Sequence, residues 1–370
     1  MNKEVIKISL SALFADLGYQ GLISLFPLLI VIQLNVSYTV YGIIEALSYG
    51  LGALFGFLGG LLGDRYGRKK IAIIGNSLMI LMSISALPYS EILTPLLFIL
   101  GWWMRNFRTP PRRAMLSEVS SSSELKLAFG ILHALDIGGG VASVGIMVIL
   151  LNLGLSFKEI YLVSIPFFII STVFLILVRA GNKVEIKVRS KGISSKVLVL
   201  SIASSLFGIT SFSFGFPILT IFTRSNSDII SIVSYGIFLT ISATSGIIIS
   251  KFTWTGVNTL AILGYGFSAV GSILMATSTT VELLYLGAFF LGLSTGVIET
   301  LEPYLVATLS KIEDMGTAMG LVSAGRSIGL FISNVLMGVL FETSQFYAYM
   351  YSLSASITAA LLTILILKKK

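Results

Sequence analysis

Residues 128–143 read AFGILHALDIGGGVAS, and residues 318–333 read AMGLVSAGRSIGLFIS. The two stretches are 190 residues apart, and five of the residue pairs at this offset are identical. The same offset places Pro27 on Pro217. The chain of 370 residues therefore reads as one unit of about 190 residues written twice, the pattern of a tandem structural repeat. The identical pairs are Ala128/Ala318, Gly130/Gly320, Ala134/Ala324, Gly139/Gly329 and Ser143/Ser333.

The composition places both copies of the repeat in a membrane. Apolar residues make up 55% of the chain and charged residues only 11%, far below the roughly 25% of a soluble domain. Twelve apolar runs are long enough to cross a bilayer as helices. We therefore predict an all-α membrane protein with twelve transmembrane helices in two pseudo-symmetric six-helix bundles. The runs lie near residues 7–33, 38–62, 70–88, 94–117, 124–151, 158–179, 196–222, 228–250, 256–277, 281–308, 316–340 and 346–367.

The positive charges indicate how the helices are oriented. If the N-terminus is inside, 20 of the 25 Lys and Arg residues fall in cytoplasmic segments, and only Lys158 and Arg224 fall in external loops. The net charge of +8 is thus a topology signal, and no nucleic-acid partner is expected. We predict a multi-pass protein of the plasma membrane with both termini in the cytoplasm.

Two residue counts limit the chemistry of the chain. It has no cysteine, so disulfides and thiolate metal sites are excluded, and its single histidine, His133, excludes a multi-histidine metal site. We expect no metal and no cofactor. The long hydrophilic stretch after Arg179 predicts an N-terminal bundle over residues 1–179, a cytoplasmic linker over 180–195 and a C-terminal bundle over 196–370. A monomer is expected, with the lipid bilayer, a small solute and protons as partners.

Residues 60–69, between the second and third runs, read GLLGDRYGRK. This stretch resembles the loop signature G-x-x-x-D-R-x-G-R-R of the major facilitator superfamily and lies where that family has it. The resemblance, with the twelve runs and the duplication, covers the whole chain. It implies a transporter that alternates access between two bundles, and a latch between their cytoplasmic ends. Independently, we expect Asp64 to meet the positive N-terminal end of the eleventh helix near residues 315–317. The alternative for the cations of the loop is that they only fix topology. The predicted latch residues are Gly60, Asp64, Arg65, Gly67, Arg68, Lys69 and Glu118.

Ionisable residues inside membrane helices are costly and usually face a cavity or a partner. Arg105, Arg108 and Arg112 fall at i, i+3 and i+7, so they form one stripe on the fourth predicted helix. The repeat aligns Asp136 with Arg326, and likewise Arg112 with Glu302. We therefore predict two ion pairs of inverted sign. Arg108 or Arg112 pairs with Asp136, and Glu299 or Glu302 pairs with Arg326.

Asp16 differs from these charges because its repeat equivalent is Leu206 and no cation follows it on the first helix. A carboxyl group without a cation partner in a medium of low dielectric binds a proton readily. Asp16 is therefore a candidate proton carrier, and the alternatives are a polar cavity wall or a partner of Arg105. The ion pairs have a purely structural alternative, and His133 is either a proton relay or a hydrogen-bonded structural residue. The proton-coupling candidates are Asp16, Asp136, His133 and Glu299.

In the resembling family, helices one, four, seven and ten line the central cavity. The leading interpretation is proton-coupled efflux of amphipathic or cationic compounds, similar to drug:proton antiporters. Uptake of an anionic metabolite by symport is the alternative, a non-transporting membrane receptor or scaffold is a remote one, and no enzyme is expected. The prolines at 110, 111 and 303 predict breaks in the fourth and tenth helices. The cavity candidates are Asp16, Gln20, Arg105, Arg108, Phe212, Phe216, Glu299, Glu302 and Arg326.

Overall fold

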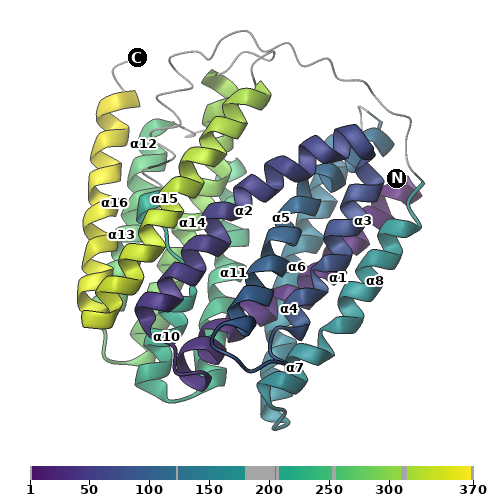
Figure 1. Ribbon diagram of the computed structural model, residues 1–370. Helices are drawn as coiled ribbons and strands as arrows, with labels where there is room; N and C mark the ends of the chain where they lie inside the picture. Colours follow the sequence, from purple (N-terminus) through teal and green to yellow (C-terminus); the bar gives the residue numbers. More distant parts are fainter. Residues whose placement is uncertain are drawn as a thin grey trace. The chain divides into compact units, whose positions relative to one another are not determined.

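The computed structural model describes residues 2–121, 124–179, 205, 208–251, 256–309 and 315–367. Within these residues the fold is all-α and contains no strand (Figure 1). The helices up to residue 179 are α1 Lys3–Pro27, the π-helical turn η1 Leu28–Gln33, α2 Tyr38–Tyr66, α3 Arg68–Leu78, α4 Ile80–Ile84, α5 Leu93–Val119, α6 Leu125–Asn152, α7 Phe157–Val163 and α8 Ile165–Ile176. Those that follow are α10 Gly215–Ser225, α11 Asp228–Lys251, α12 Val257–Thr259, η2 Leu260–Tyr265, α13 Gly266–Thr277, α14 Val281–Leu309, α15 Met315–Thr343 and α16 Gln345–Leu367.

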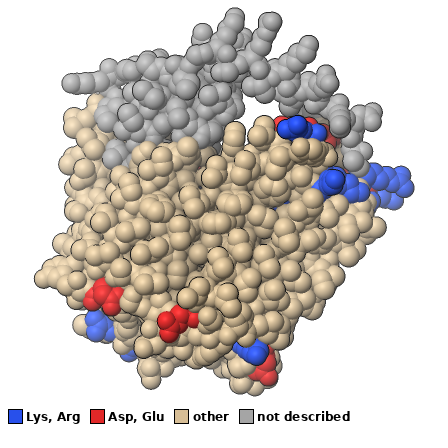
Figure 2. All heavy atoms as spheres, in the orientation of Figure 1, with Lys and Arg blue, Asp and Glu red and all other residues tan. Residues whose placement is uncertain are grey.

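Nine helical segments of the described residues are long and apolar enough to cross a membrane. The other three predicted runs fail this test for visible reasons. The run at 70–88 is divided into two shorter helices, α3 and α4. The run at 94–117 forms α5, whose arginines lower its mean hydropathy. Part of the run at 196–222 precedes α10. Figure 2 shows a face on which charged side chains are sparse and lie towards its two ends, as expected of a surface that contacts lipid.

The contacts within the chain group it into two compact units. The first unit comprises residues 1–36 and 51–186, and the second comprises residues 37–50 and 187–370. The two units therefore share α2, because its first thirteen residues, Tyr38–Gly50, contact the second unit and the remainder contacts the first. The sequence repeat did not predict this division of a single helix.

In the first unit, α1 packs against α6, α8 and α5. Its small residues make this possible, since a Cβ atom at Gly21 would lie 2.8 Å from the hydroxyl oxygen of Ser143. The Ser143 hydroxyl donates to the carbonyl of Leu17 and accepts from the backbone N–H of Gly21, each at 2.8 Å. These bonds fix α6 to α1 one turn away from Asp16.

The two prolines of the fourth predicted helix do not break it, so that prediction is wrong. Helix α5 continues through Pro110 and Pro111, and α14 likewise continues through Pro303. A proline leaves the carbonyl four residues earlier without its helical donor. For Pro111 this is the carbonyl of Phe107, which lies against Gly59 of α2 so closely that a Cβ atom there would collide with it. The freed carbonyl thus becomes a close contact between helices instead of a break.

In the second unit, α14 packs against α11 and α13, and α16 packs against α13 and α15. The first part of α2 joins this unit through glycines. A Cβ atom at Gly42 would lie 2.5 Å from the carbonyl oxygen of Asn334 and 2.7 Å from the Cα atom of Gly338, both on α15. Small residues of this kind let two membrane helices approach to backbone contact.

Candidate functional site

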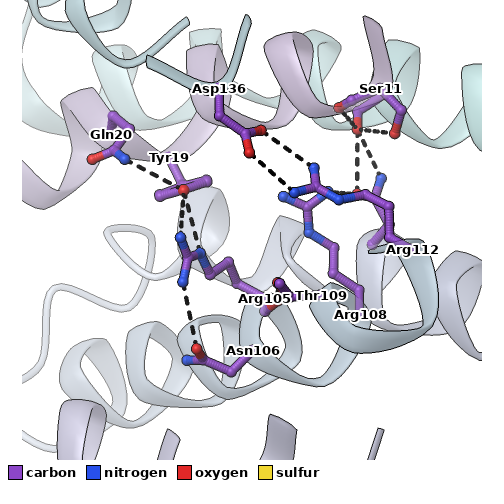
Figure 3. A network of polar contacts seen from close by, with 11 residues as sticks. Ser11, Tyr19, Gln20, Arg105, Asn106, Arg108, Thr109, Arg112 and Asp136 are labelled. Atoms are coloured by element: carbon purple, nitrogen blue, oxygen red, sulfur yellow. Dashed lines mark hydrogen bonds and ion pairs between the residues drawn. The ribbon is translucent and has the colours of Figure 1, made fainter. Parts of the chain in front are cut away.

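The arginine stripe predicted on α5 exists, and each arginine has different partners (Figure 3). Arg112 is bound by Asp136 of α6 through two parallel contacts, Nη1 to Oδ1 at 3.4 Å and Nη2 to Oδ2 at 3.3 Å. The side chain of Arg112 is only 4% exposed, and that of Asp136 is 22% exposed. The predicted pairing of Asp136 with an arginine of α5 is confirmed, and its partner is Arg112.

Arg108 is almost completely buried and forms no salt bridge with any described carboxylate. Its Nη1 donates to the Oδ1 of Asn76 at 2.6 Å. The Nδ2 of Asn76 in turn donates to Ser171 at 3.1 Å, and the Ser171 hydroxyl donates to the carbonyl of Ser11 at 2.6 Å. A buried cation held only by neutral groups is unusual, because several kcal/mol of lost hydration are normally offset by an opposite charge.

Arg105 is half-buried and is held in place by aromatic side chains. Its Nε and Nη2 donate to the hydroxyl of Tyr19 at 3.2 and 3.1 Å. The guanidinium carbon lies 5.3 Å from the ring centre of Tyr19 and 5.1 Å from that of Trp102. Gln20 also reaches the Tyr19 hydroxyl, at 3.3 Å. These contacts orient the cation without neutralising it.

Asp16 lies beside this network and is 3% exposed. Its Oδ1 makes no hydrogen bond to any described residue. Its carboxyl group lies near the Asp136 carboxyl group, and the two negative charges repel one another. Gly139 of α6 allows this approach, because a Cβ atom there would lie 3.2 Å from the Cβ of Asp16 and 2.6 Å from the carbonyl oxygen of Leu13.

These side chains form one charged cluster in the first unit, within two helical turns of α5. It holds the guanidinium groups of Arg105, Arg108 and Arg112 and the carboxyl groups of Asp16 and Asp136. With both acids ionised, three positive charges face two negative charges. Protonation of one acid increases the positive excess. The carboxyl groups of Asp16 and Asp136 thus control how much of the arginine charge is neutralised.

The second unit contains the inverted counterpart. Arg326 of α15 pairs with Glu302 of α14, and its Nη1 lies 3.7 Å from the Oε1 of Glu299. Both the Arg112–Asp136 pair and the Arg326–Glu302 pair are separated by 24 residues, as the 190-residue offset requires. This confirms the second predicted ion pair. The side chain of Glu299 is 57% exposed, whereas that of Glu302 is 8% exposed.

The aromatic cavity candidates of the second unit pack against other aromatic rings. Phe216 is fully buried and lies 5.3 Å from both Tyr41 and Phe341, measured between ring centres. Phe212 is half-buried and contacts Tyr349 edge-on at 5.9 Å. Phe216 thus belongs to the packed interior of this unit, so its predicted role in a cavity would require the surrounding rings to move.

The loop between α2 and α3 places the predicted latch residues at the end of the first unit. Arg68 contacts Asp64 at 2.8 Å and Glu118, at the end of α5, at 2.6 Å. Partial burial lowers the pKa of Arg68, but the hydrogen bonds and charges of Asp64 and Glu118 outweigh this effect and raise the pKa overall. Gly67 has φ +104°, a conformation that favours glycine and lets the chain turn directly into α3.

The other latch candidates have separate contacts. Lys69 donates to the carbonyl of Ile176 at 2.7 Å, and Arg65 lies 5.2 Å from the ring centre of Tyr66. Gly60 faces Pro110, since a Cβ atom there would lie 3.6 Å from the proline Cβ. The backbone of residues 315–317 begins α15, and their side chains lie outside the described residues. The latch itself remains a prediction.

Two further observations complete the account of the predicted residues. His133 is exposed on α6, and it has no described hydrogen bond or ion pair. In the part of the chain that the structure describes, no group of three or more His, Cys, Asp or Glu residues is placed to hold a metal ion.

The sequence did not predict two residues of the site, Asn76 and Tyr19, which hold Arg108 and Arg105. Their only signal was a polar side chain within an apolar run, and each run contains several such side chains.

Comparisons with known proteins agree with this architecture. The family model described as Major Facilitator Superfamily matches residues 8–259. An uncharacterised MFS-type transporter of Methanocaldococcus jannaschii is 23% identical over 99% of this chain and 95% of its own length. The fold is similar to the crystal structure of the nucleoside transporter NupG, with a TM-score of 0.80, 12% identity and 99% coverage of each chain.

A D-xylose–proton symporter gives a TM-score of 0.78 with 13% identity, over 97% of this chain and 96% of that one. A transporter of the POT family crystallised with 5-aminolevulinic acid gives 0.78 with 12% identity, over 100% of this chain and 96% of that one. At these identities the structural likeness shows the fold alone, whereas the family model covers more than half of the chain. The chain therefore belongs to the major facilitator superfamily of secondary transporters.

Proposed function

We propose that this protein is a proton-coupled secondary transporter and that the neighbouring carboxyl groups of Asp16 and Asp136 carry the coupling proton. The observation that carries the proposal is a buried acid, Asp16, which has no ion pair among the described residues and lies beside the partly exposed Asp136. Two carboxylates this close repel one another, so a shared proton stabilises the pair. A site of this kind loads and releases a proton when its surroundings change.

The geometry around Arg105 supports a small organic anion as the cargo. Its guanidinium group is oriented by Tyr19 and Trp102, belongs to a half-buried side chain, and forms no described salt bridge. A guanidinium group binds carboxylates and phosphates through parallel hydrogen bonds, so a fixed, accessible arginine is a suitable anion-binding group.

The charge count then links the cargo to the proton. When the carboxyl pair is ionised, it neutralises most of the arginine charge and weakens anion binding. When the pair takes up a proton, the positive excess grows and an anion binds more tightly. By thermodynamic linkage, a bound anion also increases the affinity of the pair for the proton. Proton and anion would therefore move together, as in symport.

Efflux of amphipathic or cationic compounds in exchange for protons is the second candidate, and Glu299 supports it. This carboxylate is 57% exposed and lies at the longer distance from Arg326, so it has charge available for a cation. A cation and a proton compete for the same carboxylates, which is the requirement for antiport. The two candidates thus predict opposite signs of coupling.

The test uses proteoliposomes that contain the purified protein and a trapped pH dye. Small organic anions and organic cations are added outside one at a time, and radiolabelled solute uptake is followed in parallel. Symport predicts that an added anion acidifies the interior, whereas antiport predicts that an added cation makes it alkaline. Solute uptake without any proton movement would contradict the proposal. The matched control is Glu91→Gln, which removes an exposed carboxyl group and should leave coupling unchanged.

The topology, domain and localisation predictions fit this function. We propose that both termini and the Asp64 loop face the cytoplasm at the plasma membrane, and that the bundles over residues 1–179 and 196–370 act as a monomer. The concentration of basic residues in the segments assigned to the inside supports the orientation. Protease protection of tags placed at either terminus, in sealed cells and in inverted vesicles, tests it directly.

A further inference from the structure

The first part of α2 buries an acid, Glu45, that is not part of the proposed coupling site. Glu45 is 5% exposed, although it lies in a membrane span of the second unit. Its carboxyl group lies beside the hydroxyl groups of Tyr41 and Ser213. Ser213 is itself fixed, since its backbone N–H donates to the Oδ1 of Asn334 at 2.8 Å.

The surroundings of Glu45 contain hydroxyl groups but no described lysine or arginine partner. Among the described residues, the titratable group that faces it is Tyr41 of its own helix, and the segment before α10 contributes Ser213. On α15, Glu342 instead accepts a hydrogen bond from the backbone of Thr39, in the first turn of α2. A buried carboxyl group that lacks a cation is more stable when it is neutral, because an ionised one loses its hydration without compensation.

The position of Glu45 connects its burial to helix packing. Gly42, Glu45, Ala46 and Gly50 lie on one face of α2, at spacings of three and four residues. A Cβ atom at Gly42 would meet the backbone of α15, and one at Gly50 would meet the ring of Phe331 on the same helix. Glu45 is therefore buried by the same contact that holds the first part of α2 on the second unit.

This contact restricts the movement of the first part of α2. The later part of α2 packs against α5 of the first unit, where a Cβ atom at Gly59 would collide with a carbonyl group. If both ends of α2 stay packed, α2 cannot move relative to α15 or to α5. Alternating access thus requires the first part of α2 to separate from α15, or to bend near Gly50. Separation exposes Glu45 to water.

We infer that Glu45 is a second proton-binding site, which holds the first part of α2 on the second unit when it is protonated and favours separation when it is ionised. The charge pattern assigns this end of α2 to the outside, so external acid would favour the packed state. The inference rests on the alternating access of the proposed function, and it adds a proton-sensitive gate separate from the carboxyl pair of the first unit.

The test uses the absence of cysteine from the chain. Ala46→Cys places a single thiol beside Glu45, at a position that is fully buried while α2 is packed. A membrane-impermeant maleimide is added outside right-side-out vesicles, and the labelling rate is measured from about pH 5 to about pH 8. Thiols react faster at high pH, so each rate is divided by the rate in the Glu45→Gln background, where the thiol chemistry is the same.

The rate ratio should rise about tenfold over this range. This is the change expected if Glu45 binds a proton about ten times more tightly in the packed state than in the separated state. A ratio that stays constant with pH would overturn the inference. Glu45→Ala also removes the ionisable group, and it serves as the reference background if the Glu45→Gln variant fails to fold. The assay needs no substrate, so its result is independent of cargo and coupling direction.

Asp16→Asn provides the control that separates this gate from the proposed coupling site. In the Ala46→Cys background, Asp16→Asn should retain the pH-dependent labelling, and Glu45→Gln should abolish it. The opposite result would assign the titration to the carboxyl pair of the first unit and contradict the role of Glu45. A failure of solute-driven proton movement with intact pH-dependent labelling would contradict only the proposed function.

Discussion

Removal of Asp136 should destabilise the first unit, because it leaves the guanidinium group of Arg112 buried without its carboxylate. At 3.3 Å and an effective dielectric constant of about 20, two unit charges attract by about 5 kcal/mol. Truncation of one partner of a buried ion pair costs about 3–5 kcal/mol. Since the side chain of Asp136 is 22% exposed, water can partly replace it, and we expect Asp136→Ala to cost about 3 kcal/mol.

The second substitution isolates the interaction. Arg112→Met removes the charge and keeps most of the side-chain volume, so the Asp136→Ala/Arg112→Met variant has no unpaired buried charge. Because the double variant leaves neither charge of this pair alone, its cost should be about 2 kcal/mol smaller than the sum of the single costs. The free energies of unfolding come from SDS titrations in mixed micelles. The matched control is the Glu4–Lys7 pair near the start of α1, which is more exposed and should show a coupling of about 0.5 kcal/mol or less.

The reasoning would be refuted if the coupling of Arg112 and Asp136 did not exceed that of the control pair. Such a result would mean that water or the other groups of the network stabilise each charge separately. Asp16 is the group most able to do so, since it lies beside Asp136. Measuring the same single and double variants in an Asp16→Asn background would then show how much Asp16 stabilises the charge of Arg112.

The remaining predictions concern helix packing and the latch loop. Gly42→Val should hold the first part of α2 away from α15 and increase the external labelling of Ala46→Cys at all pH values, whereas unchanged labelling would exclude this contact as a gate. Gly59→Val should lower the melting temperature by several degrees in scanning fluorimetry, because the new side chain meets a carbonyl of α5. Arg68→Ala should cost about 1 kcal/mol of unfolding free energy in the SDS titration, and Arg68→Ala/Glu118→Ala should recover part of it.

The sequence predicted the features that depend on periodicity and on the repeat. Helix spacing alone placed the three arginines of α5 on one face. The 190-residue offset predicted that Asp136 and Arg326 would both have partners of opposite sign, and both ion pairs are present. These predictions succeeded because the two halves of the chain share a backbone arrangement even where their side chains exchange sign.

The features that were not predicted depend on contacts between residues far apart in the sequence. The effect of Pro110 and Pro111 could not be predicted from α5 alone, because the freed carbonyl of Phe107 packs against a glycine of α2. The choice of Arg112 over Arg108 as the partner of Asp136 depended on Asn76, which binds Arg108. Periodicity assigns residues to faces of a helix, but it does not say which neighbouring helix supplies the partner.

The burial of Glu45 illustrates the same limit. Its sequence neighbours show an acid in the first part of a membrane span, and nothing in them identifies Ser213 as a partner more than 160 residues away. The division of α2 between two units could not be predicted either, because the repeat assigns every helix to one bundle. Both findings required the contacts of the folded chain.

Asp16→Asn in proteoliposomes tests the central claim most directly. The measurement compares pH-gradient-driven solute uptake with solute exchange at equal pH on both sides, in the same preparation. If Asp16 and Asp136 carry the coupling proton, the variant should lose gradient-driven uptake and retain exchange, because the solute still binds and the protein still alternates. Gradient-driven uptake that persists at the unsubstituted rate would contradict the account.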